Sequence, residues 1–296
     1  MKNHIFSGCA TALITPFSED LKKIDCKTYE RLIEYQLLKG TDALVVAGTT
    51  GESPVLSKDE KLQLIKTAVN TAHKKIPVIA GTGSNNTEEA VRKSNDAEKQ
   101  GVDGLLIVTP YYNKTTQEGI IEHYFYIADR VSTPIIVYNV PSRTGFDIKP
   151  ETYKALCAHK NISGIKEAGG NISAFLKTMS LCRGKIDIYS GNDDQTGVMM
   201  SHGAAGVISV AANIIPDIMH ELCSAFLKGD FKIGCDLQLK YLELMNGLFT
   251  EVNPIPVKAA AELLFGISCR PRLPLPALCP QKREKLKQLM LQYGLL

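Results

Sequence analysis

The chain has 296 residues, of which 44% are apolar and 22% charged, and its formal net charge is +3. This composition is typical of a globular protein with one large core or two ordinary domains. The charge is small and dispersed, so we expect no nucleic-acid partner. No apolar run approaches the roughly 18 residues that span a bilayer, and no signal-peptide pattern is present. We therefore expect no membrane association and a cytoplasmic location.

Eight short apolar runs follow one another along the chain, each nearly continuous in hydrophobicity, as parallel strands covered on both faces are. The runs are Cys9–Ile14, Ala43–Ala47, Val78–Gly81, Leu105–Thr109, Ile135–Tyr138, Ile162–Lys166, Ile186–Tyr189 and Val207–Val210. Their spacing is that of βα units, and it predicts an α/β fold with a closed (β/α)8 TIM barrel. An open doubly wound sheet is the alternative, but no Gly-x-Gly-x-x-Gly pattern follows the first run.

Helix signals separate these runs. Ser57 and Glu60 form a predicted capping box, and Thr115 with Glu118 repeats the pattern further along. Pro150 fits the first position of another helix. These signals place helices between the predicted strands.

Beyond residue 213 only helical patterns follow. They cover Pro216–Lys228, Asp230–Phe249, Asn253–Phe265 and Pro280–Gln292. We expect the first of these to close the barrel, which gives a catalytic barrel over residues 1–228 and a C-terminal helical extension over residues 229–296. Arg270–Pro276 is predicted to be an extended surface connector.

The eight cysteines are scattered, with no Cys-x-x-Cys pair and no histidine at the spacing of a zinc site. A chain of this size does not need disulfides for stability, so we expect buried thiols. Asp193 and Asp194 are adjacent carboxylates, which we interpret as a solvated cap because no third metal ligand is evident. No metal and no cofactor is expected.

Polar side chains follow several runs at their carboxyl ends, where the active sites of (β/α)8 barrels lie. They are Thr49, Thr50, Tyr111, Tyr112, Tyr138, Arg143 and Lys166. Burial among apolar neighbours lowers the pKa of a lysine and makes its amine a nucleophile for carbonyls, and a nearby tyrosine can transfer protons. For Lys166 alone, a side chain that extends to solvent is the simpler interpretation. The surrounding polar residues favour an active site instead.

The loop Gly48–Ser53 is rich in small hydroxyl residues and glycine. Its successive backbone N–H groups could hold a carboxylate, although an ordinary strand-to-helix turn explains the composition equally well.

Five motifs in order resemble the dihydrodipicolinate synthases, a branch of the pyruvate-dependent class I aldolases that include N-acetylneuraminate lyase. They are GTTGES (48–53), PYYNKTTQEG (110–119), YNVPSRTG (138–145), GIKEA (164–168) and GVISV (206–210). The resemblance extends from Gly8 to Leu296 and includes NPIPVK at 253–258. It implies a lyase of lysine and diaminopimelate biosynthesis, which condenses pyruvate with L-aspartate-4-semialdehyde to 4-hydroxy-tetrahydrodipicolinate without a cofactor.

The same resemblance implies catalytic roles for four residues. Lys166 would form the Schiff base with pyruvate, and Tyr138, Thr50 and Tyr112 would form a proton relay. In this family Tyr112 would reach across a tight-dimer contact into the neighbouring subunit's site. The expected assembly is a homotetramer built as a dimer of dimers.

Substrate-binding roles are also implied by the resemblance. Thr49 and Thr50 would bind the carboxylate of pyruvate, and Arg143 would bind the carboxylate of the second substrate at the mouth of the site. The carbonyl oxygen of Ile208 would lie near the lysine amine.

Two other functions remain open at this point. A related aldolase for sugar-like aldehydes would share the lysine and the tyrosine, but Arg143 suits a carboxylate-bearing aldehyde better. A non-catalytic sensor of pyruvate-like ligands is the second alternative, and an intact proton relay argues against it.

Four further residues resemble a lysine effector pocket at a dimer interface. They are Ser53, Asn85, Glu89 and Tyr111. Members that lysine inhibits typically carry histidines where this chain has Lys58 and Lys61, and a smaller residue in place of Pro54. Two additional cations would repel a cationic effector. We therefore expect a non-functional pocket and weak or absent inhibition by lysine.

Overall fold

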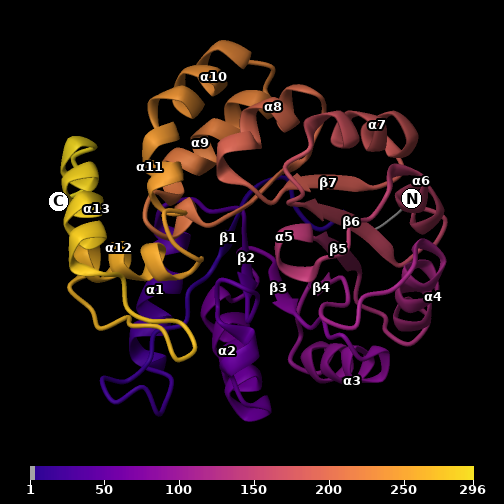
Figure 1. Ribbon diagram of the computed structural model, residues 1–296, viewed down its shortest axis with the longest axis horizontal. Coiled ribbons are helices and arrows are strands. Elements are labelled where there is room, and N and C mark those ends of the chain that lie inside the picture. Colours follow the sequence, from indigo (N-terminus) through magenta and orange to yellow (C-terminus); the bar gives the residue numbers. More distant parts are fainter. Residues whose placement is uncertain (1–3) are drawn as a thin grey trace.

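The computed structural model describes residues 4–296 and contains a closed barrel of eight parallel strands in sequence order (Figure 1). The strands are β1 (Gly8–Ala12), β2 (Ala43–Val46), β3 (Val78–Gly81), β4 (Gly104–Val108), β5 (Ile135–Asn139), β6 (Ile162–Glu167), β7 (Asp187–Ser190) and β8 (Gly206–Ser209). Strand β1 pairs with both β2 and β8, which closes the sheet. The predicted barrel is confirmed, and the open sheet is excluded.

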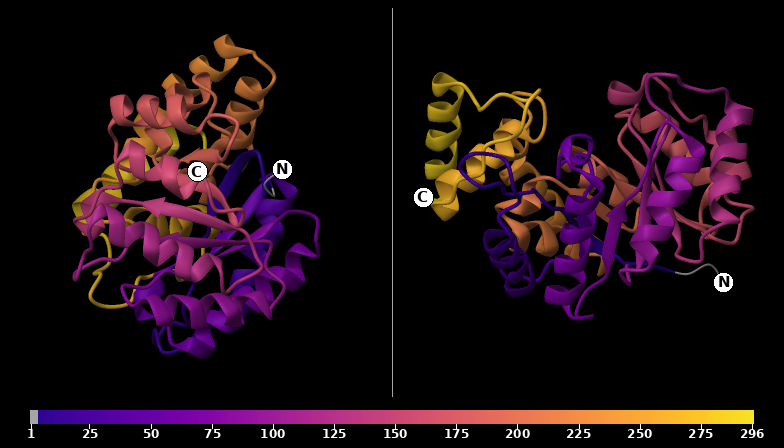
Figure 2. Two further views of the ribbon diagram at one scale, coloured as in Figure 1. Left: turned by 90° about the vertical axis from the view of Figure 1, so that its right-hand side faces the viewer. Right: turned by 90° about the horizontal axis from the view of Figure 1, so that it is seen from below.

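Helices surround the barrel and continue beyond its last strand. They are α1 (Cys26–Leu38), α2 (Lys58–Ala72), α3 (Thr87–Glu98), α4 (Gln117–Ala128), α5 (Pro141–Thr144), α6 (Pro150–Leu156), α7 (Ile172–Cys182), α8 (Thr196–Ser201), α9 (Pro216–Leu227), α10 (Phe231–Lys240), α11 (Leu242–Gly247), α12 (Ile255–Phe265) and α13 (Pro280–Gln292). Short 3₁₀ turns lie at Ser53–Val55, Asp193–Gln195 and Ala211–Asn213. The C-terminal helices α12 and α13 lie to one side of the barrel (Figure 2). Within residues 4–296, no helix is both long and apolar enough to cross a membrane.

One of the two predicted capping boxes is present. The Ser57 hydroxyl accepts a hydrogen bond from the Glu60 N–H at 3.1 Å, and the Glu60 carboxylate accepts one from the Ser57 N–H at 2.9 Å. The second prediction is wrong, because Thr116 rather than Thr115 caps α4 and accepts from the Gly119 N–H. The helix starts one residue later than expected, so Glu118 is too close to the cap to complete a box.

Two details of the C-terminal half differ from the sequence prediction. The single helix expected over Asp230–Phe249 is divided into α10 and α11 at Tyr241, whose buried ring stacks on Tyr293 at 5.2 Å between ring centroids. Packing against a residue far along the chain overrides the local helical pattern here. Cys235 and Cys279 are exposed, so the expectation of buried thiols is wrong for these two.

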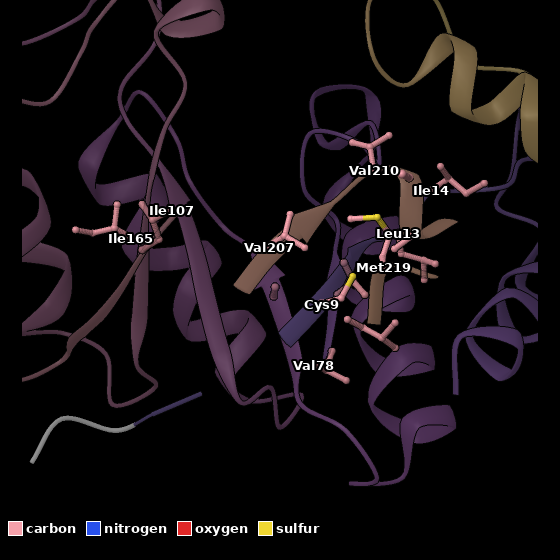
Figure 3. Close-up of a cluster of buried hydrophobic side chains, with 14 of the residues drawn as sticks. Cys9, Leu13, Ile14, Val78, Ile107, Ile165, Val207, Val210 and Met219 are labelled. Atoms are coloured by element: carbon pink, nitrogen blue, oxygen red, sulfur yellow. The ribbon is translucent and has the colours of Figure 1, made fainter. Parts of the chain in front are cut away.

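Alternation of side chains along each strand separates two apolar clusters. The larger cluster lies between the strands and the helices and includes Ile107, Ile165 and Val207 (Figure 3). The smaller cluster, formed by the intervening positions, fills the interior of the barrel and includes Tyr138 and Ile208. Because Ile165 belongs to the outer cluster, the next residue on β6 faces the barrel interior.

A buried ion pair joins the loop after β2 to the C-terminal segment. Lys258 of α12 is fully buried, and its ammonium group bonds to the Glu52 carboxylate and to the backbone oxygens of Thr15 and Arg270. The other Glu52 oxygen accepts from the backbone N–H of Arg272 at 2.9 Å. The boundary at residue 228 stays a prediction, but the predicted extension is bonded to the barrel at this point.

Breaking this ion pair should strongly destabilise the fold. We expect Lys258→Met to lower the free energy of unfolding by about 3–5 kcal/mol, because it leaves the Glu52 charge buried without its partner. The double variant Glu52→Gln/Lys258→Met should recover part of this loss. Lys232→Met removes an exposed pair with Asp236 and should have no measurable effect. Urea denaturation checks this, and equal losses for the single and double variants would contradict it.

Candidate active site

Lys166 lies on β6 with its amine in the barrel interior. It pairs in register with Tyr138 of β5 on one side and Tyr189 of β7 on the other, and only 5% of its surface is exposed. Burial lowers the pKa of Lys166 to about 8; the carboxylate of Asp193 opposes this shift and the Arg143 charge adds to it. A substantial fraction of the amine is therefore neutral near physiological pH, as a nucleophile for carbonyls requires.

The ring of Tyr138 lies close to this amine. The Lys166 Nζ lies 4.5 Å from the centroid of the Tyr138 ring, and both side chains are buried. Burial raises the pKa of the Tyr138 hydroxyl, while the Arg143 charge and the Thr49 side chain lower it. The phenol thus keeps its proton at neutral pH and can donate it to a developing alkoxide.

Asn253 connects two of the predicted binding residues. Its side-chain Nδ2 donates to the Thr50 hydroxyl at 3.0 Å, and its backbone oxygen accepts from the guanidinium of Arg143 at 2.9 Å. Thr50 and Asn253 are buried, whereas Arg143, on the short helix α5, is exposed. The contact of Asn253 with the site residues could not be predicted from local sequence patterns, because Asn253 lies 203 residues from Thr50. Only the resemblance of the NPIPVK segment drew attention to it.

A pocket of about 370 Å³ opens beside Tyr138. Thr49, Tyr138 and Arg143 line it, as do Ser53 and Tyr111. Its size suits a small ligand. The structure therefore brings three of the predicted site residues to one cavity, together with two of those predicted for an effector pocket.

Other predicted residues lie outside the lining of this cavity. Lys166 and Thr50 are almost fully buried, and Ile208 lies in the barrel interior with Tyr138. Tyr112 is 92% exposed and has a positive φ of 69°, so its side chain does not take part in the pocket of its own chain.

Three of the four predicted effector residues line cavities, and they are divided between two of them. Ser53 and Tyr111 line the pocket beside Tyr138, whereas Glu89 lines a second pocket of about 360 Å³ at α2 and α3. Asn85 lines neither, and its backbone oxygen accepts a hydrogen bond from Asn113 at 2.9 Å.

Asp193 is a candidate that the sequence interpretation missed. The expected solvated cap is wrong, because Asp193 is only 2% exposed. One of its carboxylate oxygens accepts from the backbone N–H groups of Val210 and Ala211, just after β8, and the other has no hydrogen-bond partner among residues 4–296. Burial raises the pKa of Asp193, whereas the Ser209 side chain, the backbone N–H groups of Ala211 and Val210 and the charge of Lys166 lower it. Asp193 is therefore a buried carboxylate whose charge favours the ammonium form of Lys166.

Among residues 4–296, no group of three or more His, Cys, Asp or Glu side chains is arranged so that it could hold a metal ion. The chemistry that the site supports on its own residues is imine formation at Lys166 with proton transfer by Tyr138.

A (β/α)8 barrel with a buried lysine amine against a tyrosine defines an aldolase-type lyase that works through a Schiff base. Residues 5–293 match the Dihydrodipicolinate synthetase family. The 4-hydroxy-tetrahydrodipicolinate synthase 1 of Clostridium acetobutylicum is 50% identical over 292 residues, which cover 99% of each chain. The chain belongs to the dihydrodipicolinate synthetase family.

Solved structures agree with this assignment. A dihydrodipicolinate synthase from Thermotoga maritima is 44% identical with a TM-score of 0.97, and the match covers 99% of this chain and 100% of that one. A DHDPS from Cyanidioschyzon merolae, described with lysine bound, is 37% identical with a TM-score of 0.96, over 99% of this chain and 100% of that one.

The pKa of Lys166 should set the pH dependence of imine formation. Trapping of a pyruvate imine with borohydride should become faster as pH rises through about 8, because only the neutral amine attacks the carbonyl. Asp193→Asn should move this midpoint to lower pH by about half a unit to one unit, since the carboxylate favours the ammonium form. Trapping rates measured between pH 6 and 9 (roughly the range around that pKa) check this.

Asp194→Asn serves as the matched control, because Asp194 is exposed and adjacent to Asp193. An asparagine at 193 can still accept hydrogen bonds from Val210 and Ala211 through its amide oxygen. An unchanged midpoint in Asp193→Asn would contradict the electrostatic role, and so would an equal shift in Asp194→Asn.

Proposed function

We propose that this chain condenses pyruvate with L-aspartate-4-semialdehyde to 4-hydroxy-tetrahydrodipicolinate, as a cytoplasmic enzyme of lysine and diaminopimelate biosynthesis. The observation that carries the proposal is the buried Lys166 amine, with its pKa lowered to about 8 and Tyr138 opposite it. Family membership and the relatives named 4-hydroxy-tetrahydrodipicolinate synthase support the choice of substrates.

The first half of the proposed reaction activates pyruvate. The neutral Lys166 amine attacks the keto carbon, and loss of water gives an imine. The protonated imine withdraws electrons, so the methyl group of pyruvate loses a proton and becomes the nucleophilic carbon of an enamine. Thr49 and Thr50, in the loop after β2, would bind the pyruvate carboxylate through their hydroxyl and N–H groups.

The second half forms the carbon–carbon bond. The enamine carbon attacks the aldehyde carbon of the semialdehyde, and the Tyr138 hydroxyl gives its proton to the new alkoxide. The amino group of the semialdehyde then attacks the imine carbon, which releases Lys166 and closes the ring. Arg143 would bind the substrate carboxylate, because it lines the same pocket as Tyr138 and carries a guanidinium suited to this group.

The proton relay is proposed to need a second copy of the chain. Tyr138 and Thr50 are buried within one chain, but Tyr112 is 92% exposed and is not among the residues that line the pocket of its own chain. We propose that Tyr112 enters the site of a neighbouring chain, within a homotetramer arranged as a dimer of dimers. The 92% exposure of Tyr112 leaves its side chain accessible to a neighbouring chain, as this proposal requires.

Lysine is proposed to inhibit weakly or not at all. Lys61 lines the cavity that contains Ser53 and Tyr111, and it would repel a cationic effector. Lys58 contributes less to this repulsion than its charge suggests, because it is paired with Asp96 at 2.6 Å. The C. merolae relative described with lysine bound gives a reference protein for the comparison.

Competition among aldehydes tests the proposed reaction. The purified protein receives pyruvate together with aspartate semialdehyde, N-acetylmannosamine and glyceraldehyde, and mass spectrometry follows each aldehyde. We expect selective loss of the semialdehyde, and no loss with Lys166→Arg, because arginine cannot form the imine. Loss of a sugar-like aldehyde would instead assign the chain to another aldolase activity. No loss at all would favour a pyruvate sensor.

Arg143→Ala should impair the use of the semialdehyde far more than that of pyruvate. Loss of one charge-assisted carboxylate contact should raise the KM for the semialdehyde by about tenfold or more, while pyruvate trapping at Lys166 changes little. Steady-state kinetics with each substrate varied in turn measure both effects. Equal losses for both substrates would give the arginine a structural role through its bond to Asn253.

Inhibition assays with lysine check the regulatory prediction. We expect activity to fall by less than half at about 1 mM lysine, since the lysine side chain would meet the charge of Lys61. Half-inhibition at sub-millimolar lysine would contradict this expectation.

A further inference from the structure

The segment before β1 crosses the end of the barrel at which the strands begin, opposite the predicted active site. Phe6 belongs to the apolar cluster inside the barrel and is only 4% exposed. Ile5 packs against the same cluster, and a Cβ added to Gly104, the first residue of β4, would lie 3.2 Å from its side chain. His4 bonds to Asp187, the first residue of β7, at 2.8 Å. The segment therefore contacts both β4 and β7 at their amino ends.

Tyr189 of β7 is the residue that Phe6 covers. The two rings stack with their centroids 4.2 Å apart and their planes within 9°, and the Tyr189 hydroxyl donates to the backbone oxygen of Phe6 at 2.7 Å. Tyr189 is fully buried and in register with Lys166. Its ring also covers Gly164, which lies on the same face of β6 as Lys166 and nearer the start of the strand, because a Cβ added there would be 3.1 Å from the ring. The stacked rings thus fill the barrel interior between Lys166 and the amino ends of the strands.

We propose that Phe6 and Tyr189 form the floor of the active site, a positioning pair that keeps water away from the Lys166 amine at the closed end of the barrel. Two stacked aromatic rings exclude water, and the hydroxyl that they carry already donates its proton within the pair. Desolvation is the largest cause of the lowered pKa of Lys166, so a floor that excludes water maintains the neutral amine. This role rests on the proposed imine formation at Lys166.

Titratable groups approach the lysine or its floor from several elements. Among residues 4–296 they include Tyr138, Arg143, Asp193, Tyr189, His4 and Asp187. A substitution at Phe6 removes none of these groups. A change in the pKa of Lys166 in such a variant would therefore report on access of water rather than on a lost charge.

Borohydride trapping of the pyruvate imine as a function of pH tests this role in the full chain. Phe6→Ala should raise the midpoint of the trapping profile by about half a pH unit or more, because water beneath the amine stabilises its charged form. Phe6→Val opens less space and should raise the midpoint in the same direction by less, which provides the test if the alanine variant does not fold. Tyr189→Leu should also raise it, and the conservative Tyr189→Phe, which retains the ring, should restore the original midpoint.

Phe175→Ala is the matched control. Phe175 of α7 is 2% exposed but packs in the outer apolar cluster, so its truncation should destabilise the fold without moving the midpoint. Urea denaturation of each variant separates a loss of stability from a change in the pKa of the amine.

The outcomes distinguish this role from the proposed reaction. An unchanged midpoint in folded Phe6→Ala or Phe6→Val, with normal trapping by the unmodified protein, would overturn the floor role alone. An equal rise in Phe175→Ala would also overturn it, because any loosening of the fold would then move the midpoint. Absence of trapping in the unmodified protein would contradict both the proposed reaction and the floor role.

Discussion

The register between β5 and β6 determines the chemistry of this barrel. It places Tyr138 directly beside Lys166 on the inner face, while the preceding residue on each strand packs in the outer apolar cluster. The same alternation that builds the core therefore buries an amine in the barrel, where desolvation lowers its pKa. A shift of one residue on β6 would turn the lysine away from Tyr138 and into the apolar layer between the strands and the helices.

Segments from distant parts of the chain complete the site around this pair. Asn253 bonds to Thr50 and Arg143, and Lys258 in the following helix bonds to Glu52 in the loop that carries the threonines. The C-terminal segment thus fixes the loop after β2 and the guanidinium at the pocket mouth together. A substitution in this segment can alter substrate binding even though it lies outside the barrel strands.

Much of the fold follows from local sequence patterns, because continuous apolar runs and helix caps depend on neighbouring residues. The strand around Lys166 and the cap at Ser57 were predictable for this reason. Long-range contacts were not. The burial of Asp193 depends on N–H groups that follow β8, and the break at Tyr241 depends on a ring in the last segment. The site lysine was predictable, but its electrostatic balance was not.

Borohydride reduction in the presence of pyruvate, followed by peptide mapping, tests the central claim most directly. We predict a single adduct on the peptide that contains Lys166, heavier by the mass of pyruvate less one oxygen atom, because reduction of the imine leaves a secondary amine. The adduct should be absent from Lys166→Arg. A stable adduct on another lysine, or no adduct in a folded protein at pH values around the lysine's pKa of about 8, would contradict the assignment of Lys166 as the nucleophile.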